Sequence, residues 1–210
     1  NIIGNYIGTD TSGINGLGNI KGIRLGYDTT IIISNNIVAG NSGMGMSIEG
    51  CYNSIIKANK IGVNINGDML PNGSDAIQLG WSEACMVGGL NSADQNIIAY
   101  SPVGVNMSVG LNVSVLRNSI YGNTKGIYVS PGSNNNISPP VITTANHDTI
   151  SGTSSPLARV ELFYNVDPPN SPQGKIYIDF STADTSGYWQ YVGTVNNPCA
   201  ITASQTDSGK

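Results

Sequence analysis

An internal repeat with a fixed period constrains this chain more than any other feature. Residues 7–26 recur, with substitutions but in register, as residues 61–80, and every matched pair lies 54 positions apart. The retained residues are mainly glycines and aliphatic residues, for example Gly13 with Gly67. A fixed period that retains glycines and isoleucines and little else is typical of a stacked solenoid.

Two short motifs alternate within this repeat, with further apolar pairs between them. The first motif is Gly-apolar-x-apolar, at residues 22–25, 45–48, 76–79 (with Ala76 in place of Gly), 104–107 and 126–129. The second is Asn-x-Ile or a near variant, at residues 5–7, 35–37, 59–61, 96–98 and 118–120. Each unit of about 22–31 residues therefore carries three short strands separated by turns.

Three short strands per turn of chain, with glycine at the corners, predict a parallel β-helix. Alternation along each strand sends Ile23 and Leu25 inward and Arg24 outward, and the same position in the next coil stacks about 4.8 Å away. The predicted inward columns are Ile23, Met46, Ile77, Val105 and Ile127, and Leu25, Ile48, Leu79, Met107 and Val129. A third column of Asn5, Asn59 and Asn118 predicts a ladder of buried amides at one corner.

These motifs resemble those of a known protein class. Residues 1–13, which read Asn-Ile-Ile-x-Asn-x-Ile-Gly-Thr-Asp-x-x-Gly, are followed by a Gly-Ile-x-Leu coil. Together they resemble the right-handed parallel β-helix repeat proteins of bacteria, within the pectate-lyase-like superfold. The resemblance implies an all-β solenoid of about five coils over residues 1–136, in a large secreted or surface-attached protein. It does not imply one activity, because the superfold includes lyases, glycoside hydrolases, epimerases, adhesins and inert stalks.

A change of pattern predicts a second domain over residues 137–210. Pro139 and Pro140 follow a polar run and cannot continue a ladder of strands. Beyond them, six apolar runs separated by turns predict a small antiparallel β-sandwich, at residues 141–144, 149–153, 158–164, 175–180, 188–192 and 200–206. This region resembles the immunoglobulin-like modules that follow such β-helices, and we expect it to be truncated at its C-terminal end.

Amino-acid composition and the first coil limit the classes of partner and the kind of protein that we expect. The net charge of −4, with only 10% charged residues, disfavours nucleic acid and anionic membranes, and no apolar run approaches the roughly 20 residues of a membrane span. Because the chain begins inside a repeat, we expect a piece of a longer protein with neighbouring domains. We expect polysaccharides or host and surface glycans as partners and no cofactor.

No catalytic group emerges from the repeat. A glycoside hydrolase needs converging carboxylates, but the predicted outward column contains none: Arg24, Ser47, Gln78, Asn106 and Tyr128. A lyase needs a basic residue beside an acidic calcium site, whereas Arg24, Lys57 and Arg117 occupy different positions in their coils. We therefore favour a non-catalytic stalk, adhesin or carbohydrate-contacting scaffold; a polysaccharide lyase or glycoside hydrolase remains the alternative.

Two aromatic residues give the clearest indication of a binding surface. Tyr27 and Trp81 follow equivalent glycines two coils apart, which places them about 9–10 Å apart on one corner. That spacing is close to that of alternate sugar rings, and aromatic faces stack on sugars. Arg24, Gln78 and Tyr128 are predicted to flank them. The competing interpretation is that both aromatic rings simply cover the corner of the solenoid.

Two loops could bind calcium or could be ordinary turns. Alternate oxygen side chains occur at Asn64, Asn66 and Asp68 and at Asp10 and Ser12. The same spacing arises wherever Asn and Asp shape tight turns, and we favour turns, with no metal site.

The remaining reactive residues are expected to be inert. Cys51, Cys85 and Cys199 are odd in number, which favours small buried thiols over a disulfide framework. His147 is the only histidine and has no evident partner for a triad or a zinc site. Residues 184–187 and 207–209 are predicted to be turns.

Overall fold

The computed structural model describes residues 1–165, 172–195 and 200–207. The chain divides into two compact units, residues 1–136 and residues 137–210. Cys199, Ser208 and Gly209, for which we predicted a buried thiol and a turn, lie outside the described residues. No helix in the described part of the chain has the length and apolar character to cross a bilayer.

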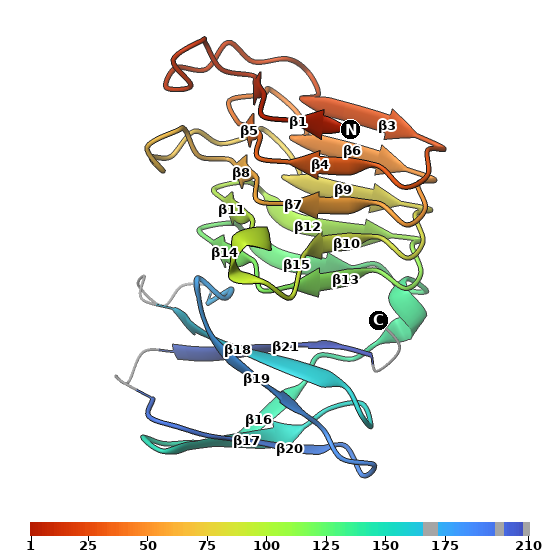
Figure 1. Cartoon of the computed structure of the whole chain (residues 1–210), viewed down its shortest axis with the longest axis vertical. Coiled ribbons are helices and arrows are strands. Elements are labelled where there is room, and N and C mark those ends of the chain that lie inside the picture. The colour runs from red at the N-terminus through yellow and green to blue at the C-terminus, as the bar shows by residue number, and fades with distance from the viewer. Residues whose placement is uncertain (166–171, 196–199, 208–210) are drawn as a thin grey trace. The chain divides into compact units, whose positions relative to one another are not determined.

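The first unit is a parallel β-helix (Figure 1). One sheet consists of β1 (Ile2–Ile3), β4 (Ile32–Ser34), β7 (Ile55–Lys57), β10 (Met86–Gly88) and β13 (Ser114–Leu116). The second consists of β2 (Tyr6–Ile7), β5 (Ile37–Val38), β8 (Lys60–Ile61), β11 (Ile97–Ala99) and β14 (Ser119–Tyr121). The third consists of β3 (Ile23–Gly26), β6 (Met46–Glu49), β9 (Ile77–Gly80), β12 (Val103–Ser108) and β15 (Lys125–Val129). Each sheet takes one strand from each coil, which confirms the predicted solenoid of about five coils.

The predicted columns of inward side chains are confirmed by the strand register. Ile23 pairs with Met46, Met46 with Ile77, Ile77 with Val105, and Val105 with Ile127. All but the last of these side chains are buried, and they belong to one continuous core. Ile127 is 37% exposed, and its strand β15 is the end strand of the third sheet.

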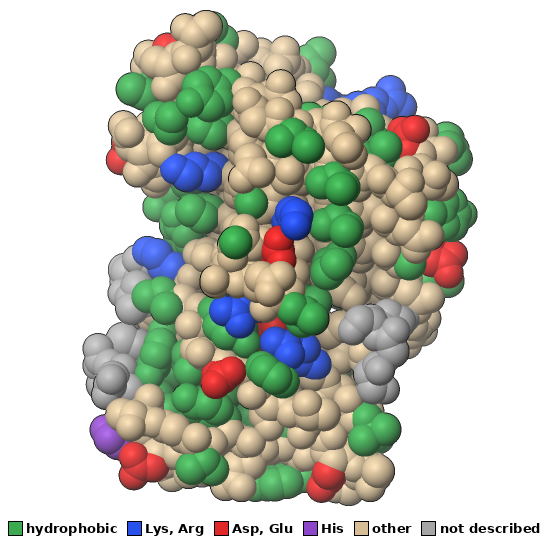
Figure 2. All heavy atoms as spheres, in the orientation of Figure 1, with side chains coloured by type: hydrophobic (Ala, Val, Ile, Leu, Met, Phe, Trp, Pro, Cys, Tyr) green, Lys and Arg blue, Asp and Glu red, His purple; other side chains and the backbone are tan. Residues whose placement is uncertain are grey.

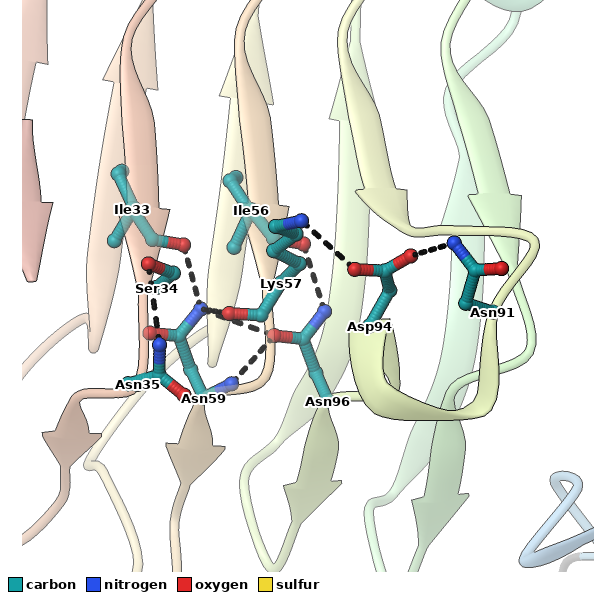
Figure 3. A network of polar contacts seen from close by, with 9 residues as sticks. All are labelled: Ile33, Ser34, Asn35, Ile56, Lys57, Asn59, Asn91, Asp94 and Asn96. Carbon is teal, nitrogen blue, oxygen red and sulfur yellow. Dashed lines mark hydrogen bonds and ion pairs between the residues drawn. The ribbon is translucent and has the colours of Figure 1, made fainter.

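The predicted amide ladder exists and is longer than expected. It runs through all five coils in the order Asn5, Asn36, Asn59, Asn96 and Asn118. The Nδ2 of Asn59 donates to Oδ1 of Asn96 at 3.0 Å and to the Ile33 carbonyl at 2.9 Å (Figure 3). The assignment of the motif to residues 35–37 was wrong by one position. Asn36 is the ladder residue, while Asn35 has a left-handed backbone (φ 57°).

A second amide ladder was not predicted. The Oδ1 of Asn72 accepts from both the backbone N–H and the Nδ2 of Asn41, at 3.2 and 2.9 Å. The Oδ1 of Asn41 in turn accepts from the backbone N–H and the Nδ2 of Asn19. In the last coil, Asn123 accepts from the backbone N–H of Ser101 at 3.0 Å. The amides of this ladder satisfy backbone N–H groups at the corner that leads into the third sheet.

The long loops of coils one and three stack across the short second coil. The backbone N–H of Ile65 donates to the carbonyl of Gly13 at 3.0 Å. The backbone N–H of Gly40, in the second coil, donates to the carbonyl of Leu70 at 3.1 Å. The two loops that the 54-residue period matches in the sequence are therefore in contact with each other. Their contact supports the interpretation of these loops as structural elements.

The second unit contains two antiparallel sheets of three strands. One holds β16 (Val141–Ala145), β17 (Thr149–Thr153) and β20 (Tyr188–Val192). The other holds β18 (Arg159–Asn165), β19 (Ile176–Thr182) and β21 (Ala200–Thr206). Both sheets contribute to one core, which includes Ile150, Leu162 and Trp189. All six strands lie within two residues of the predicted runs.

Candidate functional site

The outer face of the third sheet carries the residues that we predicted to flank a ligand. The register aligns Arg24 with Ser47, Ser47 with Gln78, Gln78 with Asn106, and Asn106 with Tyr128. Arg24 and Tyr128 are exposed, Gln78 and Asn106 are partly buried, and Ser47 is fully buried. The column is therefore continuous, but its residues in the second, third and fourth coils are less open to solvent than those of a fully solvated face.

Small residues border this polar column on both sides. On one side lie Gly22, Gly45, Ala76, Gly104 and Gly126. On the other side the aligned residues are Gly26, Glu49, Gly80 and Ser108. Because most of these residues have little or no side chain, Glu49 stands out as the one long side chain in its column.

Glu49 is held by a short chain of hydrogen bonds along the sheet face. Lys21 Nζ donates to Ser47 Oγ at 3.2 Å, and Ser47 Oγ donates to Glu49 Oε1 at 3.2 Å. A methyl group at Gly80 would lie 3.8 Å from Glu49 Cγ, so the Glu49 side chain extends toward the third coil. The prediction that the central outward column lacks carboxylates holds, but it overlooked this carboxylate in the adjoining column.

A second polar pair lies near the opposite edge of the sheet face. Asn106 Nδ2 donates to Asp75 Oδ2 at 2.8 Å, and Asp75 is 8% exposed. The bond fixes the orientation of the amide, and Asn106 Oδ1 is buried without a hydrogen-bond partner. A buried acceptor without a donor is costly, so this atom requires an explanation.

Tyr27 and Trp81 occupy one column at the corner between the third and first sheets. The pairing of Gly26 with Glu49 and of Glu49 with Gly80 places both aromatic residues two coils apart, with Gly50 between them. Tyr27 is 88% exposed and Trp81 is 64% exposed. A methyl group on Gly50 would lie 2.7 Å from a Tyr27 ring carbon, so the Tyr27 ring covers Gly50.

Further exposed hydrophobic residues extend this corner over four coils. Val109 follows in the same column as Trp81, while Tyr52 and Leu111 lie in the next column, where Thr29, Tyr52, Glu83 and Leu111 pair in parallel. We call the five exposed residues Tyr27, Tyr52, Trp81, Val109 and Leu111 the aromatic corner. Hydrophobic and acidic side chains project beside one another along the right-hand edge of this unit in Figure 2.

The aromatic corner has a left-handed backbone at repeated positions, as other corners of this unit do at Ala58, Tyr100 and Arg117. Each turn contains two positions with left-handed φ, and the second is occupied by Thr30, Asn53, Ala84 and Asn112. The first is occupied by Tyr27 (φ 60°), Gly50 (φ 62°), Trp81 (φ 47°) and Val109 (φ 59°). Glycine and asparagine favour this conformation, whereas a β-branched residue such as valine is a genuine outlier there. Large side chains are therefore displayed at positions where backbone energetics favour small ones.

The two loops considered for calcium are held by their own hydrogen bonds. Asp10 Oδ1 accepts from Ser12 Oγ at 2.6 Å and from the Ile14 N–H at 3.2 Å, while Oδ2 accepts from Asn15 Nδ2 at 2.8 Å. These donors, with Ser12 first, hold the pKa of Asp10 well below its usual range. In the other loop, Asn64 Oδ1 accepts from the N–H groups of Asn66 and Asp68. Both loops are thus turns built by Asx side chains.

The other predicted reactive residues are scattered. Cys51 and Cys85 are buried free thiols, and burial raises the pKa of each. Lys57 Nζ pairs with Asp94 Oδ1 at 2.8 Å (Figure 3). His147 Nδ1 lies 2.6 Å from Asp148 Oδ1 on exposed surface. Within the described residues, no three His, Cys, Asp or Glu side chains converge to form a metal site.

Comparison with known families agrees with this architecture. The family model for right-handed β-helix regions matches residues 4–183. The chain therefore belongs to the right-handed β-helix family. The match continues past the fifth coil into the antiparallel strands of the second unit. Comparison with curated proteins gives no match.

Proposed function

We propose that this chain is a non-catalytic segment of a secreted or cell-surface protein and that it presents a stacked surface to a polysaccharide or to surface glycans. Its β-helix serves as a stalk or adhesin scaffold. The ligand lies along the aromatic corner and the adjoining face of the third sheet. There, Tyr27 and Trp81 supply stacking surfaces, and Arg24, Gln78 and Tyr128 supply polar contacts.

The observation that carries this proposal is the series of large, exposed side chains at strained positions. Tyr27, Trp81 and Val109 expose 88, 64 and 55% of their surface, although each has a left-handed backbone. Such a conformation costs about 1 kcal/mol for a residue other than glycine, and these side chains recover little of that by burial. The left-handed conformation recurs in every turn of this corner, but the fold does not require a large exposed side chain there, which is a reason to infer a function.

The geometry of the two carboxylates on this face supports a binding role over glycoside hydrolysis. Glu49 is paired with Gly80, and Asp75 lies five positions before Gly80 along the same coil. Each carboxylate already accepts a hydrogen bond from a neighbouring side chain on the sheet face, Glu49 Oε1 from Ser47 Oγ and Asp75 Oδ2 from Asn106 Nδ2. The two groups therefore suit separate contacts to an extended ligand.

We propose that the second unit is an immunoglobulin-like module that acts as a spacer or as a neighbouring binding domain. Its support is the pair of three-stranded antiparallel sheets around one apolar core, in which Trp189 is fully buried. A small module with a single core suits repeated use in a long extracellular chain.

A glycan array probed with the 210-residue chain tests the proposed function. The wild type is expected to bind a subset of the glycans, and Trp81→Ala and Tyr27→Ala are expected to weaken each signal at least about tenfold, because stacking contacts are lost. Tyr6→Ala is the matched control, since Tyr6 is an exposed aromatic residue on β2 of the second sheet. Equal binding by all four proteins would overturn the proposal. Release of reducing or unsaturated ends from pectin or alginate would instead favour the enzyme.

A further inference from the structure

We propose that the aromatic corner binds an internal stretch of a linear polysaccharide, which lies parallel to the solenoid axis and crosses four coils. The inference rests on the proposed function and narrows its ligand, from polysaccharides and surface glycans in general to extended linear chains. Three observations lead to it: the columns formed by the large exposed side chains, the direction of the Tyr27 ring, and the sequence of residues along each coil.

The large exposed side chains of the corner form two columns that run along the solenoid axis. The first column holds Tyr27, Trp81 and Val109, and the second holds Tyr52 and Leu111. Each of the four coils therefore contributes at least one exposed apolar side chain. With coils about 4.8 Å apart, the strip is about 14 Å long, which suits a chain with one sugar over each coil.

The Tyr27 ring is directed along this axis. A methyl group on Gly50, in the next coil, would lie 2.7 Å from Cδ1 and 2.9 Å from Cε1 of the ring, so the ring extends over the second coil. At another corner, Tyr100 covers Gly122 of the next coil in the same way, but it also packs edge-on against Tyr121, with ring centroids 5.5 Å apart. Tyr100 is partly buried, whereas Tyr27 is 88% exposed. The same arrangement thus packs one ring and displays the other.

The residues along each coil disfavour a ligand that runs around the solenoid. In the third coil, Trp81 lies between Gly80 and the buried Ser82, and Glu83 and Ala84 follow. A sugar chain that followed any one of the first three coils would therefore meet a single large apolar side chain of the corner. A chain along the axis meets one in every coil. Because sugars stack their apolar faces on such side chains, the axial direction gives the larger contact.

A glycan array that carries size series of linear glycans tests the ligand class. The probes are 1,4-linked oligomers of glucose, mannose, N-acetylglucosamine and galacturonic acid, from disaccharide to hexasaccharide, beside terminal epitopes of branched surface glycans. We expect at least one linear series to bind, with a signal that rises at least about tenfold from disaccharide to tetrasaccharide and then levels off, because two further sugars reach two further coils. Signals confined to branched epitopes, or independent of chain length, would overturn the inference but leave the proposed function standing. A blank array would remove both.

Leu111→Ala tests whether the chain crosses the coils. Leu111 lies in the fourth coil, so in calorimetric titration we expect the variant to bind the tetrasaccharide of that series at least about threefold more weakly, because its last sugar loses an apolar contact. The disaccharide, held by the aromatic residues of the earlier coils, should bind as it does to the wild type. Leu90→Ala is the matched control, since Leu90 is 60% exposed and lies between β10 and β11, outside the corner. An unchanged tetrasaccharide affinity in Leu111→Ala, as a chain along one coil would give, or an equal effect of Leu90→Ala would overturn the inference.

Discussion

Two corners of the same coil use stacked side chains in opposite ways. At the corner between the first and second sheets, Asn36, Asn59 and Asn96 point inward and bond to the coils above and below. At the corner between the third and first sheets, Tyr27 and Trp81 point outward and are largely exposed. The first corner satisfies buried backbone groups, and the second displays surface.

The difference shows at which positions this fold tolerates substitution. A buried amide in the ladder makes several bonds at once, so its removal leaves several polar groups unsatisfied. An exposed ring in a left-handed turn satisfies nothing in the fold. Substitutions at the two corners should therefore separate stability from binding.

The largest loss of stability is expected for Asn59→Leu. Asn59 Oδ1 accepts two bonds from Asn36, and its Nδ2 donates to the carbonyl of Ile33 and to Asn96. Leucine fills the space but leaves these buried groups without partners, so we expect the free energy of unfolding to fall by about 2–4 kcal/mol in urea titration. Asn5→Leu, at the exposed end of the ladder, should cost less than half as much; an equal cost would contradict a cooperative ladder.

Gly50→Ala should lower both stability and glycan binding. Its φ of 62° penalises any side chain, and the new methyl group would lie 2.7 Å from a Tyr27 ring carbon. We expect stability to fall by about 1–2 kcal/mol and glycan binding to weaken, because the Tyr27 ring must move. In a Tyr27→Ala background the steric part of the cost should disappear. Strict additivity in this double-mutant cycle would show that the ring does not rest on Gly50.

Lys57→Met should have a smaller effect that depends on pH. The hydrogen bond from Lys57 lowers the pKa of Asp94, so the pair stabilises the fold above the unfolded pKa of about 3.9 and loses that contribution as pH falls through the folded value. We expect a loss of about 0.5–1 kcal/mol at pH 7, reduced by solvent screening because Lys57 is partly exposed. Thermal unfolding of both proteins between pH 7 and pH 2 measures it. A difference that grows as pH falls would have the wrong sign.

Val109→Asn should have the smallest effect on stability, and it should raise stability where the other substitutions lower it. Asparagine tolerates a left-handed backbone and occupies the neighbouring column at Asn53 and Asn112. We expect a gain of up to about 1 kcal/mol in unfolding free energy, since only an exposed side chain is lost. A clear loss of stability would show that Val109 is structural and that the aromatic corner is not purely a display surface.

The repeat made the core predictable because inward positions depend only on alternation and period. Ile23, Met46 and Ile77 had to stack once the glycines were aligned, and they do. The ladder was harder to place in the second coil, because Asn35 and Asn36 are adjacent and only one of them can point inward. The ladder of Asn41 and Asn72 was missed because segments of different length join these residues to the preceding strands β5 and β8, although both lie four residues before the aligned Gly45 and Ala76.

The site could be predicted only in part for a similar reason. Tyr27 and Trp81 follow aligned glycines, so their shared column could be read from the repeat. Glu49 could not, because it replaces a glycine in a column that is otherwise small. The unpartnered oxygen of Asn106 depends on the orientation of one amide against Asp75, which no periodic pattern encodes.

Acrylamide quenching of tryptophan fluorescence during titration with a soluble glycan that binds on the array tests the central claim most directly. The chain has two tryptophans: Trp81 is 64% exposed, and Trp189, at 1% exposure, serves as the internal reference. We predict that Trp81 is quenched readily in the unliganded protein and becomes protected as the sugar binds, while Trp189 does not change. Binding detected by calorimetry that leaves the quenching of Trp81 unaltered would contradict the account.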